Sequence, residues 1–246
     1  MFSSPIFRRQ LFFLSLLVVA IFAVRSSIIE PFRIPTRSMT PTLMMGDFLF
    51  ANKFKYGFHV PFSEIFGSKP TYLSEEKSPE RGDVVIFAPP EAGQESLYIK
   101  RIIGIPGDRI RFEGKKVFLN GTAVDREELQ GSERDAILNH KGFDPEDRYQ
   151  KDKLHIFREH LDHHTYLTLE DDNYDGIKTD SEVVIPEDQY YVLGDNRDDT
   201  RDSRVFGTIK RHSIRGKAFV IWLSYRISLT DSHWSFRADR IGRIIQ

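Results

Sequence analysis

The sequence predicts a mostly β fold: an N-terminal transmembrane helix, an extracytoplasmic β-rich main domain and a smaller β-containing domain inserted into it. Three observations predict this fold class. An uncharged apolar run covers residues 11–24, and Arg8 and Arg9 precede it by one residue, Gln10. Beyond it, short segments rich in β-branched and aromatic residues recur between turn residues, as strands do. Within this series, residues 126–180 are polar, acidic and without a clear period, which indicates an insertion.

The apolar run is the first element. Its fourteen residues would span roughly 21 Å as a helix, and residues 10–29 would span roughly 30 Å, the thickness of the hydrocarbon core. The longer span includes Arg25 near one end, where a long side chain reaches the interface. Arg8 and Arg9 predict a cytoplasmic N-terminus. Two alternatives are a cleaved signal peptide, although no clean Ala-x-Ala site follows, and a buried soluble helix, although the run is apolar on every face.

The predicted strands follow and define the domains. They cover residues 47–52, 83–88, 97–103, 182–185, 190–193 and 217–223. Pro106-Gly107 predicts a type II turn, and Asn120-Gly121 predicts a β-hairpin over residues 116–124, because Asn-Gly favours a type I′ turn. The resulting domains are a signal anchor (residues 1–27), a β-rich core (residues 28–109 and 187–246) and an inserted acidic domain (residues 110–186).

Composition excludes several classes of protein. The 246 residues include no cysteine, which excludes disulfides, thiolate-bound metals and a Cys nucleophile. The net charge of −1 is unevenly distributed: residues 126–188 carry eight Lys or Arg against eighteen Asp or Glu, whereas residues 1–57 carry seven against two. A basic end suits a surface near anionic lipid, and the acidic segment suits a region away from it or simply a solvated surface. No basic patch alternates with aromatic residues, so we expect no nucleic-acid partner.

Two residues in separate segments form a candidate catalytic pair. Ser38 lies in a non-helical stretch between Pro35 and Pro41, and Lys100 lies in the apolar run 97–103. A Ser hydroxyl is a weak nucleophile until a base removes its proton. Burial among apolar groups lowers the pKa of a Lys, so a neutral amine can act as that base. Each motif alone is common as a turn Ser or an edge-strand Lys, but together they predict the Ser-Lys variant of serine hydrolysis.

Three stretches carry a resemblance to a known family. They are IPTRSMTPTL (residues 34–43), YIKRIIGIPGD (residues 98–108) and GDNRDDTRDSRVFG (residues 194–207). In this order, and with the apolar N-terminal segment, they resemble bacterial signal peptidase I, the leader peptidase that removes signal peptides from exported proteins. The resemblance implies a single-pass serine endopeptidase of the inner membrane, with exported precursors and the lipid bilayer as partners. It implies cleavage after small residues, at Ala-x-Ala sites, by a monomer that needs no cofactor and no metal.

The resemblance also implies roles for individual residues. Ser38 would be the nucleophile and Lys100 the general base, and the Ser38 N–H and the Thr36 hydroxyl would form the oxyanion hole. The residues implied to orient Lys100 or support the site are Thr200, Ser203, Asp202 and Arg204, with Asp202 and Arg204 as an ion pair. The implied substrate-binding residues are Met39, Tyr98 and Ile99. Thr200 stands where Ser is common in the family, which keeps the hydroxyl but restricts its rotamers.

Two other functions fit parts of the sequence. A self-cleaving regulator of the repressor type shares the Ser-Lys pair on a related β-fold, but the membrane segment and the absence of a DNA-binding helix pair argue against it. An inactive or self-processing membrane-anchored homologue, acting in assembly or binding, is opposed by the retention of Ser38 and Lys100. The histidines His160, His163 and His164 lack the spacing of a known metal motif and predict a solvated surface cluster.

Overall fold

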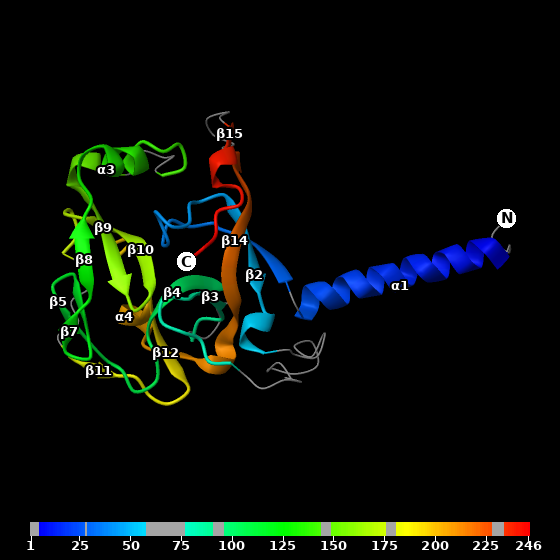
Figure 1. Cartoon of the computed structure of the whole chain (residues 1–246), viewed down its shortest axis with the longest axis horizontal. Coiled ribbons are helices and arrows are strands. Elements are labelled where there is room, and N and C mark those ends of the chain that lie inside the picture. The colour runs from blue at the N-terminus through cyan, green and yellow to red at the C-terminus, as the bar shows by residue number, and fades with distance from the viewer. Residues whose placement is uncertain are drawn as a thin grey trace.

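The computed structural model describes residues 5–27, 29–57, 77–90, 96–143, 149–175, 181–227 and 234–246, with the side chains of α1 described only up to residue 18. In these residues a single helix projects from a body of three antiparallel β-sheets (Figure 1). The predicted mostly β class is confirmed. Residue 28, where the predicted core begins, and residues 144–148 and 176–180 of the acidic insertion lie outside the described residues.

The largest sheet has eight strands. These are β1 (Ile29–Arg33), β2 (Asp47–Asn52), β3 (Val84–Phe87), β4 (Tyr98–Gly104), β12 (Gln189–Leu193), β13 (Ile209–Lys210), β14 (Ile214–Ile227) and β15 (Trp234–Phe236). Their order is β1-β2-β14-β3-β4-β12-β13, and β15 pairs with β14. Strands from both ends of the chain are therefore interleaved, which brings distant segments beside β4.

Strand β14 bends the sheet. It pairs with β3 near its start and with β2 further on, and its register shifts at Ile214/Gly216, at Ala218/Val220 and again further along the strand. Bulges of this kind bend a strand and increase its twist. The bent sheet packs its apolar side chains against residues 34–43, of which Ile34, Met39 and Leu43 are buried in the same cluster. Burial of these three side chains fixes the segment that carries Ser38.

Two smaller sheets are formed by residues 109–184. One contains β5 (Arg109–Glu113), β6 (Lys116–Leu119), β7 (Thr122–Ala123) and β11 (Val183–Val184), and the other contains β8 (Asp125–Glu128), β9 (Leu154–Leu161) and β10 (His164–Asp171). The predicted hairpin at residues 116–124 is confirmed, since β6 pairs with β7. Its turn residues Asn120 and Gly121 have φ of 53° and 84°, as a type I′ turn requires.

The sequence does not predict the longest hairpin, β9–β10, which lies in the acidic insertion. Eight residues of each strand pair, from Leu154 opposite Asp171 to Leu161 opposite His164. Asp162 occupies the turn with φ of 52°, a conformation for which Gly or Asn is the usual signal. Among the predicted cluster of histidines, His160 and His163 are exposed beside this turn and His164 is half-buried.

The remaining elements are the long N-terminal helix and several short helices. The short ones are α3 (Gly131–Leu138), α4 (Ser203–Phe206) and 3-10 turns at Phe54–Tyr56, Lys151–Lys153, Arg211–Ser213 and Ala238–Arg240. Helix α1 (Pro5–Ser27) projects away from the sheets, and all of its described side chains are exposed (Figure 1). Among the described residues, no helix is both long and apolar enough to cross a membrane. The transmembrane segment stays a prediction.

Candidate active site

Ser38 and Lys100 meet where the turn that carries Ser38 contacts β4 of the main sheet. The Nζ atom of Lys100, on β4, lies 2.7 Å from Oγ of Ser38 and 2.9 Å from the carbonyl oxygen of Ile99. Both side chains are buried. Ser38 lies in a turn that is stabilised by a hydrogen bond from the Thr40 N–H to the Arg37 carbonyl. A hydroxyl and an amine in contact, away from bulk water, can exchange a proton directly.

The environment of Lys100 favours the neutral amine. Burial lowers its pKa from 10.5 to about 8, and the negative charges of Asp202 and then Asp195 act in the opposite direction. A base with a pKa near the working pH is neutral in a large fraction of molecules and still accepts a proton readily. The amine also lies 5.5 Å from the centre of the Tyr98 ring.

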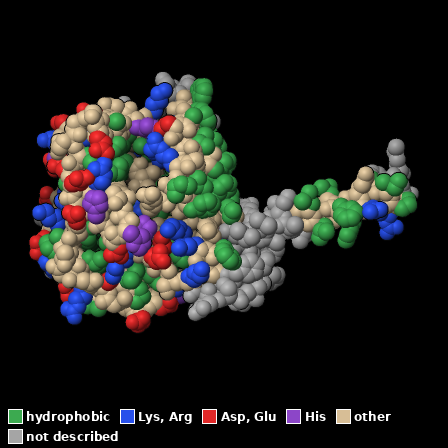
Figure 2. Space-filling model, viewed as in Figure 1, with side chains coloured by type: hydrophobic (Ala, Val, Ile, Leu, Met, Phe, Trp, Pro, Cys, Tyr) green, Lys and Arg blue, Asp and Glu red, His purple; other side chains and the backbone are tan. Residues whose placement is uncertain are grey.

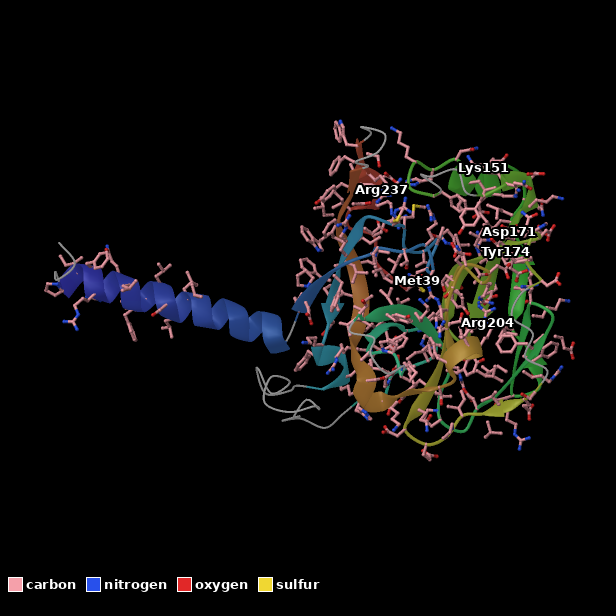
Figure 3. The ribbon with its side chains drawn as sticks, turned by 180° about the vertical axis from the view of Figure 1, so that it is seen from behind. Met39, Lys151, Asp171, Tyr174, Arg204 and Arg237 are labelled. Atoms are coloured by element: carbon pink, nitrogen blue, oxygen red, sulfur yellow. The ribbon has the colours of Figure 1, made fainter. Side chains whose placement is uncertain are left out.

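An open cavity of about 880 Å³ lies over the pair. Its walls include Thr36, Tyr98, Ile99 and Thr200, together with both members of the pair. The Thr36 hydroxyl oxygen lies 3.4 Å from Ser38 Oγ, as expected for a group beside the reacting atom. Met39 does not line the cavity: it is fully buried, and Figure 3 shows it inside the body. Of the three predicted substrate contacts, only Tyr98 and Ile99 are on the cavity wall.

The supporting residues lie on the segment before and within α4. The expected ion pair is present, since Arg204 Nη2 lies 2.8 Å from Asp202 Oδ2. Asp202 also caps α4 and accepts from the Gly194 N–H at 3.1 Å, and Ser203 Oγ accepts from the Val192 N–H at 2.9 Å. Thr200 Oγ1 is different, because it is buried and has no hydrogen-bond partner among the described residues. The structure therefore brings Thr200 to the cavity wall but gives no hydrogen bond from it to Lys100.

Asn196 and Asp195, in the stretch 194–207, also stabilise the site, although neither residue is assigned a role from the sequence. The backbone N–H of Asn196 donates to the Ser38 carbonyl at 3.1 Å, and its Nδ2 donates to the Arg37 carbonyl at 3.3 Å. Asp195 forms a buried two-point ion pair with Arg101, at 2.9 and 2.8 Å. Arg101 was detectable from the sequence, because a charge inside an apolar strand needs a buried partner.

A mostly β body with a buried Ser-Lys contact beneath an open cavity has the features of a serine hydrolase. Comparison with known proteins specifies the class. A model of the family "Signal peptidase, peptidase S26" matches residues 7–223. Signal peptidase I of Buchnera aphidicola (subsp. Acyrthosiphon pisum) is 32% identical over 253 residues, covering 92% of this chain and 78% of that protein. Signal peptidase I of Pseudomonas aeruginosa is 33% identical over 225 residues, covering 87% and 71%.

The chain belongs to the signal peptidase family, peptidase S26, and is a serine endopeptidase. The resemblance carried by the three sequence stretches is thus confirmed. A crystal structure of a signal peptidase I from Enterococcus faecalis is 27% identical and covers 57% of this chain and 97% of that chain, with a TM-score of 0.32. Because this structural overlap is low, the family assignment rests on the sequence matches.

Proposed function

We propose that this chain removes N-terminal signal peptides from exported precursors, cutting after small residues at Ala-x-Ala sites, with Ser38 as nucleophile and Lys100 as general base. The observation that carries the proposal is the 2.7 Å contact between Lys100 Nζ and Ser38 Oγ, buried beneath a cavity. The family relatives are signal peptidases I, which supports the substrate class.

The reaction follows from this contact. Neutral Lys100 takes the proton of the Ser38 hydroxyl while Oγ attacks the scissile carbonyl, forming a tetrahedral oxyanion. The resulting ammonium gives this proton to the amine of the mature protein, which leaves, and the signal peptide stays bound to Ser38 as an ester. Lys100 then takes a proton from a water molecule, whose oxygen attacks the ester, and returns a proton to Oγ. The amine therefore acts twice within one turnover.

The cavity walls supply the remaining parts. The Ser38 N–H and the Thr36 hydroxyl stabilise the oxyanion, and loss of one such donor costs roughly 10²–10³-fold in rate. Tyr98 and Ile99 line the subsites for small side chains, while Met39 supports the cavity from within the core. The substrate binds extended, paired to an exposed strand edge. Asp202, Ser203 and Arg204 fix the backbone near Lys100.

The proposed location is the inner membrane. Helix α1 would be the single span, with Arg8 and Arg9 on the cytoplasmic side and residues 28–246 outside the cytoplasm. Figure 2 shows hydrophobic side chains gathered at the edge of the body from which α1 projects. Exposed Trp222, Trp234 and Phe236 belong to β14 and β15, and large aromatic side chains suit the membrane interface. Residues 110–186, in this proposal, form an inserted domain between the two parts of the catalytic core, residues 28–109 and 187–246.

A precursor-processing assay tests the proposal. Membranes containing the full chain should process a model precursor with an Ala-x-Ala site, and Ser38→Ala and Lys100→Ala should each abolish nearly all processing. Because the two residues act as a unit, the double variant should be little worse than either single variant. Lys116→Ala, which removes an exposed lysine of β6, is the matched control and should process normally. Substantial turnover by Lys100→Ala at neutral pH would exclude this lysine as the base.

A further inference from the structure

The side chain and backbone of Asn196 connect the nucleophile segment to the inserted residues. Its N–H and Nδ2 hold the carbonyls of Ser38 and Arg37. The same Nδ2 also donates to the hydroxyl oxygen of Tyr149, at 2.9 Å. Asn196 is buried, so each of these bonds is made where no bulk water replaces it. A group that orients the Asn196 amide therefore acts on the backbone of Ser38.

Tyr149 is placed to orient that amide. Its hydroxyl accepts from Asn196 and donates to Asp199 Oδ2 at 2.7 Å, so it connects two residues of the motif 194–204. The ring of Tyr149 packs against the hydrophobic cluster that includes Met44, and its centroid lies 6.2 Å from that of the Phe143 ring. Burial, followed by the hydrogen bond to Asp199, raises the pKa of Tyr149, which keeps the hydroxyl protonated and able to donate. Tyr149 does not line the cavity.

The neighbouring contacts fasten the motif to the same insertion. Leu169, on β10, donates its N–H to the Asp195 carbonyl at 2.8 Å and accepts from the Arg197 N–H at 2.9 Å. The Arg197 guanidinium forms a buried ion pair with Glu159 of β9, at 2.5 Å. These contacts hold the motif as a whole. The Asn196 side-chain amide, which holds the Arg37 carbonyl, is itself contacted at Nδ2 by the Tyr149 hydroxyl, at 2.9 Å, and at Oδ1 by the Asp199 N–H, at 3.4 Å. Of these two bonds, the one to Tyr149 is the shorter and is the one that comes from the inserted segment.

We infer that Tyr149 is a positioning residue for the reaction proposed above: through Asn196 it fixes the Ser38 segment against Lys100. The inference rests on the proposed function. Proton transfer between Ser38 and Lys100 needs their 2.7 Å contact, and small displacements of reacting groups lower rates steeply. The inserted segment, which contributes no residue to the reacting pair, thereby takes part in the reaction.

Tyr149→Phe tests the inference in the full chain, because it removes only the hydroxyl and keeps the ring in its cluster. Precursor cleavage is measured as kcat per folded molecule and KM, beside the unfolding temperature. We expect kcat to fall about tenfold and KM to change less than about twofold. The matched control is Tyr166→Phe, in β10, since the Tyr166 hydroxyl is buried without a hydrogen-bond partner among the described residues. It should keep the kcat of the unmodified chain.

The outcomes separate this inference from the proposed function. Failure of the unmodified chain to cleave the precursor would overturn both, whereas cleavage that Ser38→Ala abolishes supports the proposed function alone. An unchanged kcat per folded Tyr149→Phe molecule, with only a lower unfolding temperature, would make Tyr149 a purely structural residue and overturn the inference. An equal loss in Tyr166→Phe would overturn it as well. Asn196→Ala combined with Tyr149→Phe should lose little more than Asn196→Ala alone, because both act on one contact.

Discussion

Two opposing effects set the pKa of the Lys100 amine. Burial disfavours the ammonium, whereas Asp202 and Asp195 favour it, and the result is a pKa of about 8 instead of 10.5. The charged form that burial disfavours is also the form that the unfolded chain adopts below pH 10.5. The neutral amine that the proposed base requires is therefore obtained at a cost to folding, which is common for groups tuned for catalysis.

This cost predicts how stability depends on pH. Between pH 8 and 10.5 the unfolded chain holds the Lys100 proton and the folded chain does not, so the free energy of unfolding rises with pH in this window. Across it the wild type should gain about 3 kcal/mol relative to Lys100→Met. Chemical denaturation of both proteins at several pH values measures the difference. Parallel curves for the two proteins would show that the folded-state pKa of Lys100 is not lowered.

The close packing around Gly194 predicts that one added methyl group at this position lowers activity severely. A Cβ at this position would lie 2.3 Å from Thr200 Oγ1 and 2.5 Å from the Ser38 carbonyl oxygen. The second contact is with a backbone atom, so the clash is relieved only if the segment that carries Ser38 moves. Gly194→Ala should lower kcat per folded molecule by roughly 10²-fold. Gly216→Ala is the control: its Cβ would meet the Asn52 carbonyl at 3.1 Å, away from the site, and kcat should stay unchanged.

Among the elements, α4 is short and depends on its N-cap. The Asp202 carboxylate is fully buried. It accepts hydrogen bonds from the N–H groups of Arg204 and Gly194 and forms an ion pair with the Arg204 guanidinium. The same carboxylate raises the pKa of Lys100. Asp202 therefore links the geometry of α4 to the proton affinity of Lys100 on β4.

Asp202→Asn separates these two effects. The amide keeps a capping oxygen but leaves Arg204 without its charge partner, and loss of one partner of a buried pair costs about 3–5 kcal/mol. Removal of the negative charge also disfavours the Lys100 ammonium, so the acid limb of the pH–rate profile should lie at lower pH in Asp202→Asn than in the wild type. The profile is measured with the precursor assay. An acid limb that moved to higher pH would contradict the electrostatic role of Asp202.

The strands that could be predicted from the sequence are those with strong turn signals or continuous apolar runs. β3, β4, β12 and the hairpin β6–β7 are of this kind, and the structure confirms them. The hairpin β9–β10 was missed because charged residues interrupt its apolar period and Asp162 replaces the usual turn residue. In the site, Ser38 and Lys100 were recognisable by chemistry. Tyr149 was not, because its partners lie 47 and 50 residues away and only packing brings them together.

At the scale of the molecule, α1 and the sheets are separable. All described side chains of α1 are exposed, so the body loses little packing when the helix is removed. A chain lacking residues 1–27 should unfold within about 3 °C of the full chain, since few buried groups are lost. It should keep its kcat in detergent or lipid, which cover the apolar edge. Calorimetry and the precursor assay check this, and a truncated chain that is folded but inactive in detergent would assign α1 a direct part in the reaction.

The contact between the Asn196 N–H and the Ser38 carbonyl also has a consequence in time. A ribosome makes Ser38 long before it makes Asn196, and at translation rates of about 5–20 residues per second the delay is roughly 10–30 s. During that interval the growing chain already carries Ser38, the proposed nucleophile, but lacks the residue whose N–H holds the Ser38 carbonyl. Order of synthesis alone thus separates the synthesis of Ser38 from the formation of the contact that holds its carbonyl.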